Sequence, residues 1–153
     1  MSSQRDLQNE CRLFHRAERR NFQLGRGTVI RTDNFKHIND RHGHHAGDLV
    51  LRDFAHRIHQ NVRRNDCFGR VGGEEFLLVM PATGPEDALA MVERMLTVIR
   101  FSRPLPDSPD FSYTCSAGIA ACLPTDSASE LYRRADQVLY DAKMSGRDRV
   151  RAA

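Results

Sequence analysis

Apolar positions recur along the chain with two kinds of spacing, which predict its helices and strands. Leu51, Phe54 and Ile58 follow one another at intervals of three and four, which is typical of a helix with one buried face, here over 48–64. The same spacing predicts further helices over 5–20, 83–100 and 127–145. Runs rich in valine, phenylalanine and small apolar residues predict strands over 27–31, 67–80, 111–122 and 149–151, the second of them folded back as a hairpin. Strands interleaved with amphipathic helices predict an α/β fold in which helices cover a central sheet.

Two of the predicted helices begin with the same polar signal. Thr83 with Glu86, and Ser127 with Glu130, have the spacing of a capping box, in which the first side chain accepts from the backbone of the fourth residue. Gly146 is placed to end the last helix. We therefore expect both helices to start with side-chain caps.

The stretch between the first strand and the helix over 48–64 is mostly polar. Phe35 and Ile38 are its apolar anchors, so we expect a loop or short helix held against the core, followed by a loop as far as Gly47.

The predicted hairpin over 67–80 has an unusual centre, Gly72-Gly73-Glu74-Glu75. Glycine tolerates positive φ and lets a ligand approach the backbone, whereas adjacent carboxylates concentrate the negative charge that hard cations require. The four residues alone fit either a solvated acidic turn or a site for metal and phosphate.

Composition narrows the function classes without choosing one. The chain has 153 residues, 40% of them hydrophobic, which is enough for one domain with a packed core. The net charge of +3 is too small to indicate nucleic-acid binding and is compatible with a phosphate-bearing ligand. Neither a membrane span of about 20 apolar residues nor the apolar core of a signal peptide is present, so we expect a soluble cytoplasmic protein without membrane contact.

Neither the cysteines nor the histidines indicate a metal site. The cysteines are far apart and are expected to be reduced, partly buried thiols: Cys11, Cys67, Cys115 and Cys122. Three clustered histidines are better interpreted as loop surface than as ligands: His42, His44 and His45.

Four motifs in order reveal a resemblance that covers nearly the whole chain from Phe35 onward. They are F-K-x-I-N-D-x-x-G-H-x-x-G-D over 35–48, R-x-x-D over 63–66, G-G-E-E-F over 72–76 and R-R-A-D-x-x-L-Y-x-A-K-x-x-G-R-x-R-V over 133–150. Together they resemble the GGDEF domain of diguanylate cyclases, and four ordered motifs are far more specific than GGEE alone. On this basis we divide the chain into an N-terminal helix, 1–24, and a GGDEF domain, 25–153.

The resemblance implies a fold and an activity. The fold is a single palm-like α/β domain with a central, mostly antiparallel five-stranded sheet and the GGEEF motif on a β-hairpin. The activity joins two GTP molecules into cyclic di-GMP with release of two pyrophosphates, in a transient homodimer that uses Mg²⁺. The implied partners are GTP and cyclic di-GMP, not nucleic acid, and a full-length parent could carry sensor domains.

The resemblance also assigns roles to individual residues. Glu74 and Glu75 are the implied catalytic residues and, with Thr32, the implied metal ligands. Asn39 and Asp48 match positions that recognise guanine, for which an amide and a carboxylate are chemically suited. The other implied substrate contacts are Phe35, Lys36, Gly72, Gly73, Lys143 and Arg147. The implied product-inhibition site consists of Arg63, Asp66 and Arg94.

One residue departs from the family pattern at a chemically important place. The family usually has Asp-x-Asp before Phe-Lys, with the first aspartate on the metal, whereas this chain has Arg31-Thr32-Asp33. A cation there repels a metal ion by several kcal/mol where water is limited. Asp33 could substitute as a ligand or Arg31 could contact phosphate, and the sequence leaves both open. The family's usual Asp-x-Leu-Thr-x-Leu-x-Asn-Arg-Arg opening is also missing.

Two hypotheses from different classes follow. The first is a diguanylate cyclase of impaired or conditional activity with an R-x-x-D product site. The second is a catalytically silent GGDEF module that binds cyclic di-GMP or GTP as a receptor.

Overall fold

The computed structural model describes residues 25–153, so the predicted N-terminal helix over 5–20 and Cys11 lie outside the described part. The described elements follow one another as β1 (Arg26–Thr32), α2 (Phe35–His42), α3 (His44–Asn61), β2 (Cys67–Arg70), β3 (Glu75–Met80), α4 (Pro85–Arg100), β4 (Cys115–Ala121), α5 (Ala128–Met144) and β5 (Val150–Ala152).

The five strands form one sheet in the order β2-β3-β1-β4-β5. All neighbours are antiparallel except β4 and β5, which are parallel. Strand β1 is central, and its register pairs Arg31 with Glu75 on one side and with Ser116 on the other. The predicted single α/β domain with a mostly antiparallel five-stranded sheet is confirmed.

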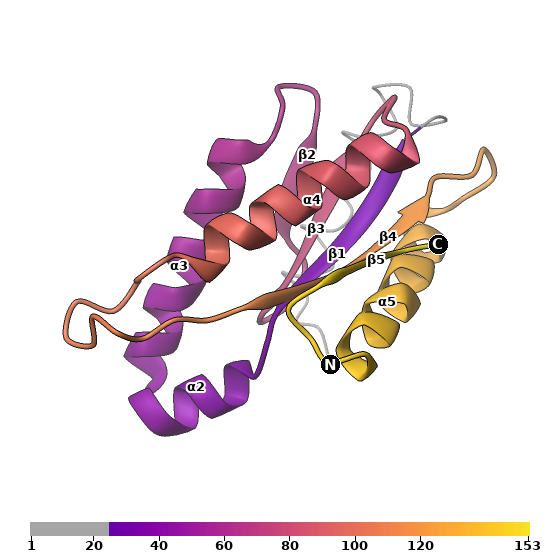
Figure 1. Ribbon diagram of the computed structural model, residues 1–153. Coiled ribbons are helices and arrows are strands. Elements are labelled where there is room, and N and C mark those ends of the chain that lie inside the picture. The colour runs from indigo at the N-terminus through magenta and orange to yellow at the C-terminus, as the bar shows by residue number, and fades with distance from the viewer. Residues whose placement is uncertain (1–24) are drawn as a thin grey trace.

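Successive residues of each strand point to opposite faces of the sheet, and each face has its own core. Ile30 belongs to the core that α2, α3 and α4 cover, whereas Val29 and Leu77 belong to the core that α5 covers. Figure 1 shows α4 passing in front of β1 and β3, with α5 at the side of β4. The helices thus cover both faces of the sheet. They leave uncovered the end of the sheet where β1 stops beside the β2–β3 turn.

The segment between β1 and α3 is more helical than its polar composition predicts. Residues 35–42 form α2, and α3 begins at His44 rather than at Asp48, so the predicted loop up to Gly47 is wrong. A single residue, Gly43 with φ of 89°, separates the two helices, because only glycine adopts this conformation without steric cost.

One predicted helix cap is present and the other is not. Ser127 accepts from the N–H of Glu130 and the Glu130 carboxylate accepts from the N–H of Ser127, which confirms the capping box of α5. Helix α4 instead starts after Gly84 without a side-chain cap, and the Thr83 hydroxyl donates to the Pro81 carbonyl at 2.9 Å. Pro85 at the first turn explains this start, since its fixed φ suits a helix N-terminus.

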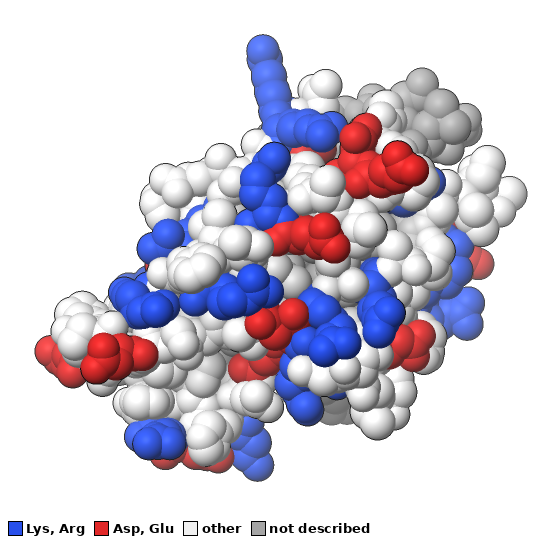
Figure 2. Space-filling model, viewed as in Figure 1, with Lys and Arg blue, Asp and Glu red and all other residues white. Residues whose placement is uncertain are grey.

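The surface of the described residues agrees with the mild net charge. Figure 2 shows basic and acidic side chains interspersed over the face that α3 and α4 cover, without a broad patch of one sign. None of the helices within 25–153 has the length and apolar character needed to cross a membrane. Cys115 and Cys122 are buried free thiols, as expected.

Candidate functional site

The end of β1 meets the start of β3, and there Arg31 and Glu75 form an ion pair. Directly paired residues of neighbouring strands point to the same face, which brings the two side chains together. The pair is half-buried, with 31% of the Arg31 side chain and 17% of the Glu75 side chain exposed. The Tyr132 hydroxyl, from α5, donates to Glu75 Oε2 at 2.9 Å. Both oxygens of the Glu75 carboxylate therefore already have protein donors.

The glycines of the hairpin do not use the positive φ that glycine allows, and their contact with a ligand stays a prediction. Neither Gly72 nor Gly73 has positive φ. A Cβ at Gly72 would lie 2.8 Å from Glu75 Oε2, whereas a Cβ at Gly73 would meet nothing within 4 Å. Gly72 thus makes room for the Glu75 carboxylate, and Gly73 leaves the tip of the turn open to solvent.

A cluster of cations lies beside the turn. Burial lowers the pKa of Lys143, the nearby positive charge of Arg31 lowers it further, and Arg147 contributes in the same direction. Asp33 and Glu74 act on the same ammonium with the opposite sign. Positive charges held this close together repel one another, and an anionic ligand such as a polyphosphate would relieve that repulsion.

Close packing of α5 on the sheet places Lys143. A Cβ at Gly118 of β4 would lie 2.2 Å from the Leu139 nitrogen, so glycine is needed there for the helix to approach. Lys143 follows Leu139 by one turn and emerges at the end of the sheet where Arg31 lies.

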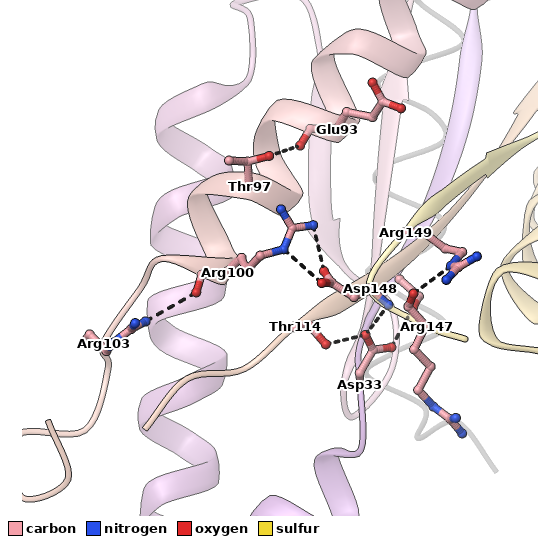
Figure 3. Close-up of polar contacts among 10 residues, drawn as sticks. Asp33, Glu93, Thr97, Arg100, Arg103, Thr114, Arg147, Asp148 and Arg149 are labelled. Atoms are coloured by element: carbon pink, nitrogen blue, oxygen red, sulfur yellow. Dashed lines mark hydrogen bonds and ion pairs between the residues drawn. The ribbon is translucent and has the colours of Figure 1, made fainter. Parts of the chain in front are cut away.

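The Asp33 carboxylate is engaged in hydrogen bonds within the protein. It is 3% exposed, and its oxygens accept from the Thr114 and Ser116 hydroxyls at 2.7 Å and from the Asp148 N–H at 3.0 Å. Figure 3 shows Asp33 directed toward Thr114 and toward the turn that carries Asp148. Its hydrogen-bonding capacity is used within the protein, so the substitute-ligand interpretation loses its support.

The donor set around the turn offers few free carboxylate oxygens to a divalent cation in this arrangement. Within residues 25–153, no three His, Cys, Asp or Glu side chains gather as potential ligands. Arg31 adds positive charge, and Glu75 is engaged with Arg31 and Tyr132. Thr32 follows Arg31 in the strand and its side chain is fully buried, so any part it plays at the turn would come from its backbone.

The expected guanine positions lie on neighbouring helices. A Cβ at Gly47 would overlap Asn39 Oδ1, so Gly47 allows α3 to approach the Asn39 amide. Asn39 Oδ1 is shielded from solvent beside Gly47 and has no hydrogen-bond partner, and a guanine contact by Asn39 stays a prediction. Asp48 is exposed and lines a cavity of about 640 Å³ together with Arg70.

The first residues of α2 divide between packing and solvent. Phe35 is partly buried and packs on the core that α3 covers. A Cβ at position 47 would lie 3.1 Å from the Phe35 ring, so Gly47 also makes room for this side chain. Lys36 is exposed. A phosphate contact by Lys36 and a substrate contact by Phe35 stay predictions.

The R-x-x-D segment forms a tight turn after α3. The Arg63 N–H donates to Asp66 Oδ2 at 2.7 Å, and the Asp66 N–H donates to the Arg63 carbonyl at 3.1 Å. Burial raises the pKa of Asp66, and the backbone hydrogen bond and positive charge of Arg63 oppose this rise. Arg63 and Asp66 line a cavity of about 280 Å³. Arg94 is exposed on α4 and is not among the lining residues of this cavity.

Two parts of this site leave no local signal in the sequence. Tyr132 lies within α5, where an aromatic residue reads as packing, so no local signal indicates its bond to Glu75. Asp148 and Thr114 are far from Asp33 in sequence, and only the fold brings them together. Asp33 itself can be selected from the sequence because it follows β1, but its hydrogen-bond partners cannot.

Comparison with known proteins identifies the family. Residues 4–149 match the family described as "Diguanylate cyclase, GGDEF domain". The chain is 41% identical over 125 residues to diguanylate cyclase DgcP of Pseudomonas aeruginosa, which covers 82% of this chain and 19% of that protein. It is 42% identical over 126 residues to diguanylate cyclase DgcM of Escherichia coli, which covers 82% of this chain and 30% of that protein. The chain belongs to the GGDEF family, and it spans less than a third of the length of these relatives.

Solved structures agree with this assignment. The active GGEEF domain of a diguanylate cyclase from Vibrio cholerae is 34% identical with a TM-score of 0.79, covering 92% of this chain and 89% of that one. The GGDEF domain of DgcB from Caulobacter crescentus, solved with c-di-GMP, is 27% identical with a TM-score of 0.84, covering 94% of this chain and 84% of that one. Diguanylate cyclase SiaD of Pseudomonas aeruginosa, solved with its activator SiaC, is 35% identical with a TM-score of 0.85, covering 96% of this chain and 56% of that one.

Proposed function

We propose that this chain is a GGDEF domain of diguanylate cyclase type that binds guanine nucleotides. In it, Arg31 impairs the conversion of two GTP to cyclic di-GMP and two pyrophosphates. The single observation that carries the proposal is the ion pair between Arg31 and Glu75. It occupies one of the carboxylates that define the GGEEF motif. The family membership supplies the reaction class, and the ion pair supplies the reason for low activity.

Each end of a bound GTP has suitable partners among these residues. Arg31, Lys143 and Arg147 gather positive charge for the triphosphate. The Asn39 amide and the exposed Asp48 carboxylate are the groups whose chemistry suits the donors and acceptors of a guanine edge.

The chemistry of the transfer explains why Arg31 matters. Attack of a 3′-hydroxyl on an α-phosphate builds charge on oxygen, which Mg²⁺ held by carboxylates would neutralise when bound. With Glu75 paired to Arg31, the carboxylate chiefly left for this purpose is Glu74 in the turn. The Arg31 guanidinium can neutralise phosphate charge but cannot lower the pKa of a coordinated hydroxyl as a metal does. Two such chains, each with one GTP, would form the transient homodimer that the reaction requires.

The deciding experiment replaces the cation with the carboxylate usual in the family. Purified wild-type protein and Arg31→Asp are incubated with GTP and Mg²⁺, and cyclic di-GMP is quantified over a series of protein concentrations. We expect at least tenfold more product from Arg31→Asp, because one recovered metal ligand contributes several kcal/mol to charge neutralisation. Arg26→Asp, at the other end of β1, is the matched control. Equal or lower activity of Arg31→Asp would overturn the proposed role of Arg31.

The receptor alternative rests on the R-x-x-D turn. Arg63 and Asp66 line a cavity, and the burial-raised pKa of Asp66 marks a carboxylate that a ligand donor would stabilise. Calorimetry with cyclic di-GMP should give saturable binding that Arg63→Ala weakens by about tenfold, as expected for loss of one charge-assisted contact. Arg151→Ala, on the exposed last strand, is the control. Binding unchanged by Arg63→Ala would remove this alternative.

We further propose that the protein is cytoplasmic and that the full-length parent carries sensor domains. The relatives are several times longer than this chain, which leaves room for such domains.

A further inference from the structure

The turn between α5 and β5 has an unfavourable backbone conformation. Gly146, Arg147 and Asp148 have φ of 116°, 62° and 45° in succession. Residues with a Cβ rarely adopt positive φ, and each such residue costs about 1–2 kcal/mol. A turn with this cost persists only where other contacts hold it.

Asp33 supplies the first of these contacts. Its Oδ2 accepts from the Asp148 N–H at 3.0 Å and from the Thr114 hydroxyl at 2.7 Å, and its Oδ1 accepts from the Ser116 hydroxyl at 2.7 Å. The Asp33 N–H also donates to the Thr114 carbonyl at 2.9 Å. A carboxylate fixed by Ser116 of β4 and by Thr114 just before this strand thus holds the backbone of the turn.

Arg100, the last residue of α4, supplies the second contact. Its Nε and one terminal nitrogen donate to the two oxygens of Asp148 at 2.9 and 3.0 Å. The hydrogen bond from Arg100 raises the pKa of the guanidinium. Figure 3 shows the resulting chain from Arg100 through Asp148 to Asp33, with the Arg147 side chain extending from the same turn on the other side.

The held turn determines where Arg147 lies. The Gly146 N–H donates to the Lys143 carbonyl and the Arg147 N–H donates to the Ala142 carbonyl, both at 3.2 Å, so the turn folds Arg147 back against the end of α5 that carries Lys143. Adjacent like charges would separate if the backbone between them were free.

We propose that Asp33 is a positioning residue for the nucleotide phosphates: it fixes the Gly146–Asp148 turn and thereby keeps Arg147 beside Lys143, with Arg100 as the second tie. This inference rests on the proposed function, because it assumes that these cations receive the triphosphate. It gives Asp33 a role that requires neither a metal nor direct contact with the ligand.

The test compares a ligand that has phosphates with one that lacks them. Wild type and Asp33→Asn are titrated by NMR with guanosine and with a GTP analogue whose α and β phosphorus atoms are joined by a methylene group. We expect Asp33→Asn to lose about tenfold in affinity for the analogue, the value of one charge-assisted contact, and to bind guanosine as wild type does. Arg147→Ala should weaken the analogue in wild type and have little further effect in Asp33→Asn, because Arg147 is then already misplaced.

A matched control separates positioning from general stabilisation. Asp53 is another carboxylate held by hydroxyls, those of Ser102 and Tyr113, but it ties α3 to the segment after α4. Asp53→Asn should lower stability as Asp33→Asn does and leave the ratio of the two affinities unchanged. Equal losses for both ligands, or additive effects of Asp33→Asn and Arg147→Ala, would overturn the inference.

A surface variant covers the case in which Asp33→Asn does not fold. The Arg100 side chain is 42% exposed, so Arg100→Gln removes the second tie at little risk to the core. We expect about a threefold loss of affinity for the analogue and unchanged affinity for guanosine, because the Arg100–Asp148 ion pair is partly exposed. Unchanged affinity for the analogue would count against the inference. A wild-type protein that binds neither ligand would instead refute the proposed function.

Discussion

Two carboxylates lie near the end of β1, and both oxygens of each have partners within the protein. The two sets of partners differ in charge and in exposure. Glu75 is paired with the guanidinium of Arg31 and with the phenol of Tyr132, and it stays partly exposed. Asp33 is buried, and its partners are neutral hydroxyls and a backbone N–H.

This difference separates a structural carboxylate from an adjustable one. A buried charge is costly to leave unpaired, so the partners of Asp33 are tied to the fold itself. The Arg31–Glu75 ion pair is partly exposed, with 31% and 17% of its side chains accessible, so the surroundings of Glu75 depend less on the fold than those of the buried Asp33.

The largest expected effect comes from removing the structural carboxylate. Asp33→Ala leaves the Thr114 and Ser116 hydroxyls and the Asp148 N–H without their acceptor. We expect a loss on the order of 3 kcal/mol in the free energy of unfolding, measured by urea denaturation. Asp40→Ala, an exposed position on α2, should stay close to wild type. A loss for Asp33→Ala no larger than for Asp40→Ala would show that the two carboxylates do not differ as described.

The next effect concerns metal dependence at the adjustable carboxylate. Because Arg31 already supplies a fixed positive charge, wild-type affinity for the methylene-bridged GTP analogue should differ less than about threefold between EDTA and Mg²⁺. Arg31→Asp should bind the analogue at least tenfold more tightly in Mg²⁺ than in EDTA, since two carboxylates then face the phosphates. Fluorescence titration measures both. Strong Mg²⁺ dependence in wild type would contradict the view that Arg31 takes over part of a metal's electrostatic role.

The smallest effect is a shift in the titration of Lys143. Burial and the charge of Arg31 lower the pKa of Lys143, so Arg31→Gln should raise it, as measured by NMR of the lysine side chain. A lowered pKa in the folded state means that the unfolded chain binds more protons between that pKa and 10.5. The contribution of Lys143 to stability should therefore improve as pH rises through this window, and less so in Arg31→Gln. An unchanged Lys143 pKa would place Arg31 further from the cluster than we infer.

The sequence predicted the fold where patterns are local. Periodic apolar residues gave α3, α4 and α5, and apolar runs gave the strands of the sheet, because amphipathic elements show their buried face in their spacing. It failed at the start of α3, where a loop was expected up to Gly47, and at α4, where Pro85 begins the helix without the expected cap at Thr83. Both failures come from interactions that propensity does not encode.

For the candidate site, ordered motifs were enough to identify the residues but not their partners. Glu74, Glu75 and Arg31 could be selected from the chain alone, and the conflict between a cation and the expected metal was visible there. The bond from Tyr132 to Glu75 and the contact of Asp33 with Asp148 join residues 57 and 115 positions apart. Such pairs depend on how α5 packs on the sheet.

The sequence by itself determined the family, the alternation of strands and helices, and the substitution at Arg31, since all three are written in residue types at fixed spacing. Tertiary structure alone decided that Arg31 pairs with Glu75 and that Asp33 is committed to the turn before β5. The physical reason is that a side chain's charge is a local property, whereas the partner that balances this charge is determined by strand register and helix packing.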